Sequence, residues 1–131
     1  MKTVIDGKEW ILELLNANKP TISGKIYIDK RITTNTEDIV INSLTMTGQF
    51  MQNGVFNVNC YVPNISVNSA GTIVQVPNKK RLKEISSQVV DVLKYHADPK
   101  YNLSIENIAQ LEETNENANY INFRVSLNAF N

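Results

Sequence analysis

The sequence predicts an α+β fold in which two helices cover one face of a single antiparallel β-sheet. Two segments carry apolar residues at helical spacing, and five segments alternate apolar and polar residues as strands do. The links between neighbouring strand segments are short, which favours antiparallel pairing because parallel pairs need long crossovers. The expected element order is α-β-β-β-α-β-β, in one domain that spans residues 1–131.

Caps and apolar stripes mark the two helices. The first is expected to begin at Asp6, with Glu9 completing a capping box, and to end before Pro20. The second is expected to begin after Asn78, in a region that Pro99 ends. The apolar stripes are Ile11, Leu14 and Leu15 in the first helix and Leu82, Ile85, Val89, Val92 and Leu93 in the second.

Five strands are predicted from period-two alternation: Lys25–Asp29, Asp38–Thr47, Val55–Val62, Leu103–Glu113 and Tyr120–Phe130. The alternation slips near Asn42 and Ser43, which indicates a bulge or a strand buried on both sides. Gly48–Gly54 and Thr114–Asn119 are predicted turns. The segment from Pro63 to Pro77 is long for a connection, so we expect it to be functional or to contain an edge strand.

The sheet face away from the helices is expected to carry aromatic and Asn side chains, with Val40 and Val55 among them. Tyr27, Tyr61 and Tyr120 fall on this face and are candidate partner-binding residues. An ordinary solvated face has the same composition, and the sequence leaves both interpretations open.

Charged residues are segregated in the second half of the chain. Thirteen basic and thirteen acidic residues cancel, which gives no general attraction to phosphates. The first turn of the second helix nevertheless contains four cations that oppose the helix dipole: Lys79, Lys80, Arg81 and Lys83. The last hairpin has an acidic edge: Glu106, Glu112, Glu113 and Glu116. These are two solvated faces, or complementary surfaces for a neighbouring subunit or an acidic partner. Nucleic acid is a lesser option, because no aromatic residues are interleaved with the cations.

No catalytic or metal site is predicted. Cys60, His96 and Asp98 have the residue types of a nucleophile set, but Cys60 falls on an apolar strand face and His96 at a helix end. Calcium-loop spacing is missing around the three candidate carboxylates, Asp29, Glu37 and Asp38. We therefore expect a protein that is not an enzyme and uses no cofactor.

The single cysteine and the N-terminus favour a reducing compartment. Cys60 has no partner for an internal disulfide, and the first residues lack the apolar segment of a signal peptide. No apolar run approaches the ~20 residues that a membrane-spanning helix needs, so we expect no membrane association.

A short first helix precedes the strand Gly24–Ile28. A long middle hairpin, one amphipathic helix and a C-terminal hairpin with Asn122–Leu127 follow. Over nearly the whole chain, this order and these lengths resemble the tail terminator, or tail-completion, proteins of long-tailed bacteriophages. The resemblance implies a small α+β subunit that forms a ring, commonly a hexamer. Such a ring caps the tail tube and forms the joint to the head, without a cofactor or catalytic residues.

The resulting functional prediction is a structural assembly protein. Its expected partners are copies of itself, tail tube proteins and head connector proteins, with nucleic acid only passing through the ring lumen. It would act in the bacterial cytoplasm during assembly and remain in the virion tail. The candidate contact segments are residues 64–76 and 79–83. The alternatives are a monomeric adaptor or inhibitor of a protein partner, and an enzyme with an unmarked pocket around Asp29, Asp38 or His96.

Overall fold

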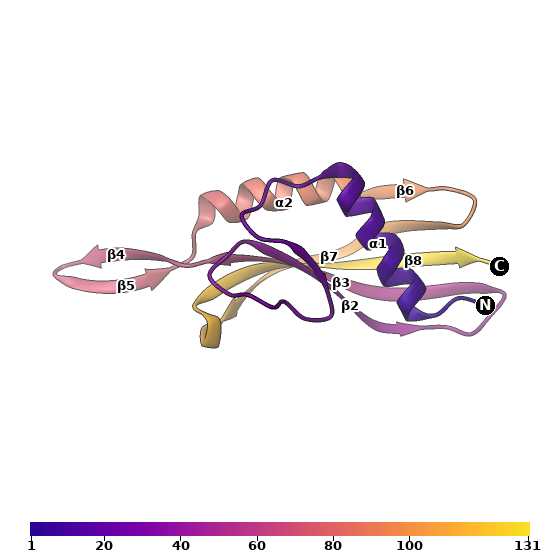
Figure 1. Cartoon of the computed structure of the whole chain (residues 1–131), viewed down its shortest axis with the longest axis horizontal. Helices are drawn as coiled ribbons and strands as arrows, with labels where there is room; N and C mark the ends of the chain where they lie inside the picture. Colours follow the sequence, from indigo (N-terminus) through magenta and orange to yellow (C-terminus); the bar gives the residue numbers. More distant parts are fainter.

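The computed structural model describes all 131 residues and contains two helices, a six-stranded sheet and a separate two-stranded sheet (Figure 1). The helices are α1 (Val4–Asn18) and α2 (Lys79–Leu93). The large sheet has the order β1-β2-β3-β8-β7-β6 and consists of β1 (Ile26–Ile28), β2 (Asp38–Met46), β3 (Met51–Pro63), β6 (Tyr95–Ala97), β7 (Tyr101–Glu113) and β8 (Ala118–Phe130). The small sheet pairs β4 (Ile65–Ser69) with β5 (Thr72–Val76), and the 3-10 turn η1 (Thr114–Glu116) links β7 to β8.

The prediction of a single antiparallel sheet is wrong, first because the large sheet is mixed. β1 runs parallel to β2, with Ile26 opposite Ile39 and Ile28 opposite Ile41, whereas the pairs from β2 to β6 are antiparallel. The loop between β1 and β2 brings the chain back to the starting end of β1. Asp29 and Asn35 adopt left-handed φ angles of 68° and 62° in this loop. A compact loop with such residues replaces the long crossover that parallel pairs usually need.

The single-sheet prediction is also wrong because residues 63–77 form a hairpin of their own. The observed order is therefore α-β-β-β-β-β-α-β-β-β, with β6 where the end of the second helical region was expected. The turn between β4 and β5 consists of Ala70 and Gly71, at φ 52° and 85°. A two-residue turn with two positive φ angles matches the twist of a hairpin, and the Asn68 side chain accepts a hydrogen bond from Gly71 N at 3.0 Å.

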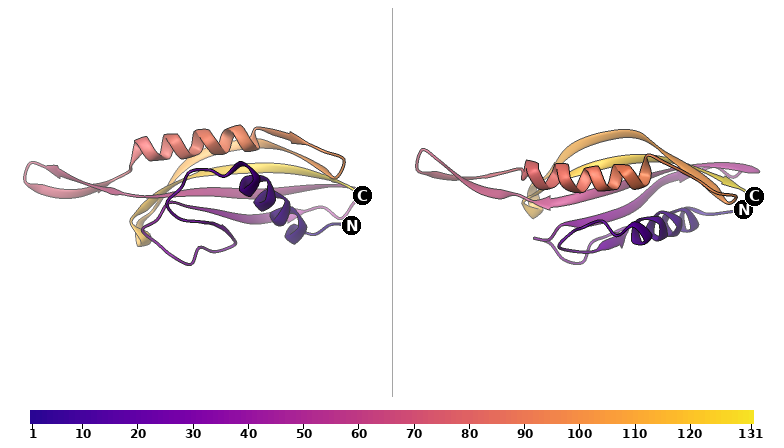
Figure 2. Two further views of the ribbon diagram at one scale, coloured as in Figure 1. Left: turned by 45° about the horizontal axis from the view of Figure 1, so that its top comes forward. Right: turned by 90° about the horizontal axis from the view of Figure 1, so that it is seen from above.

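One core lies between the helices and a single face of the large sheet. The alternating residues of β3 and β8 meet there, with Phe56 opposite Val125 and Val58 opposite Phe123. The predicted stripes of both helices join this core, through Ile11 and Leu15 of α1 and Leu82, Ile85, Val89 and Leu93 of α2. α2 runs along the strands, whereas α1 crosses them obliquely (Figure 2).

The first helix begins earlier than predicted. Thr3 is the N-cap, and the Asp6 side chain accepts a hydrogen bond from Thr3 N at 2.7 Å, so the capping box is Thr3–Asp6 and not Asp6–Glu9. Gly7 in the first turn lies against the ring of Phe56, and a Cβ there would be 2.3 Å from Phe56 Cζ. The glycine therefore lets the start of α1 approach the sheet closely, at the cost of weak helix propensity.

Candidate partner-binding surface

The β4–β5 hairpin, called the arm below, projects beyond the rest of the molecule (Figures 1 and 2). All five residues of β4 and four of the five in β5 are exposed. Ile65 pairs with Val76 and Val67 with Val74, so these four side chains share one face of the ribbon. A two-stranded hairpin is marginally stable in water, and an exposed apolar face marks an interaction surface. We therefore take this apolar face of the arm as the centre of the candidate site.

The arm is also free of charge. No Asp, Glu, Lys or Arg occurs from Pro63 to Asn78, although 20% of the chain is charged. The opposite face of the ribbon is more polar, with Ser66, Asn68 and Gln75 beside Ile73. Exposed strands that are meant to stay in water usually carry charges as protection against association. The absence of charge is therefore typical of a segment that is buried in a complex.

The base of the arm is anchored to the turn between β7 and β8. The Asn64 backbone N–H donates to Asn117 O at 3.0 Å, and the Asn117 side-chain amide donates to Gln75 Oε1 at 3.1 Å. The side chain of Asn119 in β8 donates to Asn64 Oδ1 at 2.7 Å. These bonds set the direction of the arm at its base and leave the ribbon beyond it uncovered.

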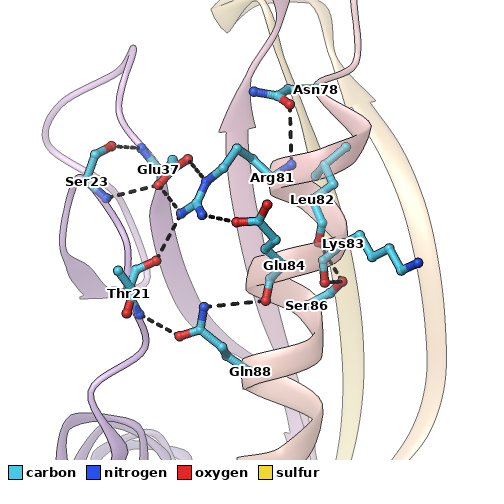
Figure 3. Close-up of polar contacts among 10 residues, drawn as sticks. All are labelled: Thr21, Ser23, Glu37, Asn78, Arg81, Leu82, Lys83, Glu84, Ser86 and Gln88. Atoms are coloured by element: carbon cyan, nitrogen blue, oxygen red, sulfur yellow. Dashed lines mark hydrogen bonds and ion pairs between the residues drawn. The ribbon is translucent and has the colours of Figure 1, made fainter.

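The predicted basic cluster separates into one anchored and three free cations. Arg81 donates from Nε and Nη2 to the two carboxylate oxygens of Glu37, at 2.7 and 2.8 Å, and from Nη1 to Glu84 at 2.6 Å (Figure 3). It also donates to Thr21 O at 3.1 Å. The hydrogen bonds from Arg81 lower the pKa of Glu37, and both carboxylates raise the pKa of Arg81. Arg81 therefore ties α2 to the segments before β1 and β2.

Lys79, Lys80 and Lys83 are exposed and form no ion pair within the chain. Figure 3 shows the Lys83 side chain pointing away from the Arg81–Glu37 contact. The helix is capped by Asn78, whose side chain accepts from Arg81 N at 3.3 Å. Three unpaired cations thus stand at the helix end that disfavours them, directly after the arm.

The structure brings two of the three candidate tyrosines together. The rings of Tyr61 and Tyr120 lie 4.7 Å apart, and the guanidinium of Arg31 lies 4.2 Å from the Tyr61 ring centre. Burial and the neighbouring Tyr120 raise the pKa of Tyr61. Tyr27 lies on β1, where its hydroxyl is 3.4 Å from Thr33 Oγ1. The aromatic surface that the sequence predicted is therefore limited to the Tyr61–Tyr120 pair and the Arg31 guanidinium beside it, and Tyr27 is not part of it.

Arg31 itself belongs to an internal network. It is buried, and its Nε donates to Glu116 Oε2 at 2.9 Å while Nη1 donates to Asp38 Oδ2 at 3.3 Å. The Lys25 backbone N–H donates to Asp38 Oδ1 at 3.0 Å. Glu116 was predicted in the acidic edge, but it pairs with this buried arginine. Glu106 and Glu112 remain exposed, and Glu113 is half-buried.

Much of the rest of the face away from the helices is occupied by Asn side chains that bond to one another. Asn57 donates to Asn42 at 2.9 Å, and Asn122 donates to Asn57 at 3.1 Å and to Asn59 at 2.7 Å. The ladder crosses from β2 through β3 to β8. This face is therefore neutral and polar, and its amides already have partners.

Of the residues weighed for catalysis, Cys60 lies apart from His96 and Asp98, and the three candidate metal-binding carboxylates do not converge on one site. Cys60 is in the core, where burial raises the pKa of its thiol. His96 on β6 contacts Asp98, with Nε2 3.1 Å from Oδ2. His96 pairs with Leu103 of β7, Leu103 pairs with Leu127 of β8, and Leu127 pairs with Gly54 of β3. His96 therefore lies in the same row of the sheet as Gly54, at a different position along β3 from Cys60. Each candidate carboxylate pairs with a different cation: Asp29 with Lys8, Glu37 with Arg81 and Asp38 with Arg31.

Surface hollows are shallow. One groove of about 290 Å³ lies between α2 and β7 and is lined by Val90, Ile108, Phe123, Ser86, Ser87 and Asp91.

No helix of the structure has both the length and the apolar character needed to cross a bilayer. The sequence matches no protein-family model, and no curated protein matches it. The candidate site is therefore defined by the arm, the three free lysines and the acidic edge of β7.

Proposed function

We propose that this protein is a structural assembly subunit whose copies join into a closed ring, in the role of a tail terminator of a long-tailed phage. The observation that carries the proposal is the uncharged arm, whose apolar face has no cover within the chain. A ribbon that projects from one side of a subunit meets a different surface on its neighbour. Such a head-to-tail interface closes into a ring when the rotation between neighbours closes.

The distribution of charge supports the same proposal. Lys79, Lys80 and Lys83 are free at one surface, and Glu106 and Glu112 are free at another. With zero net charge, copies of the chain do not repel one another as a whole. In this role the ring contacts the tail tube and the head connector, forms in the bacterial cytoplasm and remains in the virion tail. The ring lumen would pass nucleic acid without binding its sequence.

Light scattering coupled to gel filtration tests the proposal. We expect the wild-type chain to give particles several times its 14.8 kDa mass at high protein concentration. The variant Val67→Ser/Val74→Ser removes apolar surface from the arm and is expected to remain monomeric with an unchanged circular dichroism spectrum. Ile73→Ser is the matched control, because Ile73 is 62% exposed on the opposite face of the ribbon.

A wild-type particle of 14.8 kDa at every concentration and salt level would contradict self-assembly. That result would favour a monomeric adaptor or inhibitor that uses the arm on a foreign protein. An oligomer that is equally weakened by Ile73→Ser and by the double variant would contradict the role of the apolar face.

A further inference from the structure

The outer edge of β7 is a second surface that lacks a partner within the chain. β6 pairs only with residues 102–104 of β7, from Asn102 opposite Ala97 to Ser104 opposite Tyr95. β7 continues to Glu113, and no other strand lies on that side, because the sheet order ends β8-β7-β6. From Ile105 onward the edge therefore presents backbone N–H and C=O groups to which a further strand can add.

Apolar surface lies directly beside this free edge. Tyr101 and Leu103 at the start of β7 are buried, whereas Ile108 is 52% exposed although it pairs with Phe123 on the core side of the sheet. Ile108 and Phe123 line the groove of about 290 Å³ next to Val90 of α2. The core is therefore incompletely covered where β7 loses its β6 neighbour.

Acidic residues flank the apolar part of the edge. Glu106 precedes Ile108, and Glu112 and Glu113 follow the exposed Leu111. None of these three glutamates has an ion-pair partner in the chain. The arm has the converse pattern, since an apolar ribbon is followed at its base by the unpaired Lys79 and Lys80. The two surfaces thus both expose apolar side chains and free backbone groups, and they carry charges of opposite sign.

We propose that the arm of one copy docks on the β7 edge of a second copy. A strand of the arm adds to the free edge at residues 105–113, and Val67 and Val74 face the groove beside Ile108. Each arm strand has five residues, which fits within this edge. The lysines at the arm base then lie near glutamates of the neighbour. The inference rests on the proposed self-assembly and names the two surfaces that it joins.

The arm of a chain does not serve its own β7 edge. Figures 1 and 2 show the arm extending past the end of the sheet and not folding back over β7. Each copy therefore offers one arm and one free β7 edge, so that docking of one arm on one neighbour leaves an arm and a β7 edge for further copies. This arrangement is the requirement for a head-to-tail ring.

Disulfide cross-linking tests this pairing, because the only native thiol, Cys60, is buried. The double variant Val74→Cys/Ile108→Cys is oxidised at a concentration at which the chain is oligomeric. We expect a ladder of covalent dimers and larger species on a non-reducing gel, which a thiol reductant collapses. The matched control is Val74→Cys/Ile32→Cys, because Ile32 is 85% exposed but lies in the β1–β2 loop. We expect the control to give no ladder.

The two proposals fail in different ways. Oligomers that give no ladder with Val74→Cys/Ile108→Cys, or the same ladder with the Ile32 control, would overturn the docking inference and leave self-assembly standing. A wild-type chain that stays monomeric would overturn the proposed function, and the docking inference with it.

Charge reversal provides a second test that does not depend on introduced thiols. Lys79→Glu/Lys80→Glu is expected to weaken self-association by on the order of tenfold, because four glutamates then meet at the contact. Adding Glu112→Lys/Glu113→Lys to the same chain is expected to restore it. The variants are expected to fold, since acidic residues suit a helix N-terminus. Association that is unchanged by the first pair, or not restored by the second, would count against the docking of the arm on β7.

Discussion

The hairpins β7–β8 and β4–β5 both alternate aliphatic and polar residues but lie in opposite surroundings. In β8, Phe123, Val125 and Leu127 are fully buried against the helices. In the arm, Ile65 and Val67 remain 44% and 40% exposed. The comparison teaches that alternation identifies the residues that share a face. It does not identify whether the cover for that face comes from the same chain or from another one.

The strongest test of this contrast removes one large side chain from the covered hairpin and one aliphatic side chain from the arm. Phe123→Ala is expected to lower the free energy of unfolding by about 3–5 kcal/mol, because it leaves a cavity in the core. Val74→Ala is expected to change the stability of the monomer by less than about 0.5 kcal/mol. Urea denaturation at low protein concentration measures both. Equal losses would contradict the assignment of the arm as uncovered.

The next largest loss of stability is expected on the side of α2 that Arg81 anchors to Glu37 and Glu84. Arg81→Met removes the hydrogen bonds to Glu37 and Glu84, which are partly exposed, so we expect a loss of about 1–2 kcal/mol in unfolding free energy. Lys83→Met is the matched control from the free side of the same helix turn and is expected to be near neutral. If both variants lose the same stability, the separation of anchored and free cations is wrong.

The Arg81 contact also predicts a dependence on pH. The folded-state pKa of Glu37 lies below its ordinary value of 4.5, because Arg81 donates to the carboxylate. The contribution to stability is therefore present above pH 4.5 and is lost as the pH falls through the lower folded-state pKa. Between about pH 6 and about pH 3, the wild-type chain should lose more stability than Arg81→Met. Parallel pH profiles would contradict the role assigned to this pair.

The arm turn gives a smaller effect that is specific to assembly. Gly71 has a φ of 85°, which a residue with a Cβ adopts at a cost of roughly 1 kcal/mol, although no atom lies within 4 Å of the added Cβ. Gly71→Ala should therefore weaken self-association several-fold through the arm conformation and leave the melting temperature of the dilute monomer unchanged. Thr34→Ala, at an exposed residue of the β1–β2 loop, serves as a neutral comparison for monomer stability.

Local patterns predicted the covered part of the molecule well. The stripe of α2 is confirmed at Leu82, Ile85, Val89 and Leu93, and the strand predicted as Tyr120–Phe130 lies within β8. The register shift between Ser43 and Thr45 confirms a bulge close to the predicted position. These features depend on residues that are near in sequence or repeat with a simple period, so the chain alone indicates them.

Long-range arrangement was predicted poorly. The parallel pairing of β1 with β2 depends on the backbone of the loop between them, which period-two alternation does not reveal. Arg81 and Glu116 looked like surface charges, and their partners Glu37 and Arg31 are far away in sequence. The length of the segment 64–76 identified it as a contact candidate but did not predict that it forms a hairpin of its own. Ala70-Gly71 between aliphatic residues, in a stretch without charge, was the available signal.

Hydrogen exchange at two protein concentrations compares the two hairpins most directly. We predict that backbone amides of the arm, residues 65–76, exchange rapidly in dilute protein and become protected when the protein is concentrated. Amides of β8 at Phe123–Leu127 should be protected at both concentrations. Arm amides that exchange at the same rate in both samples, or that are already as protected as β8 in the dilute monomer, would contradict the claim that a second copy covers the arm.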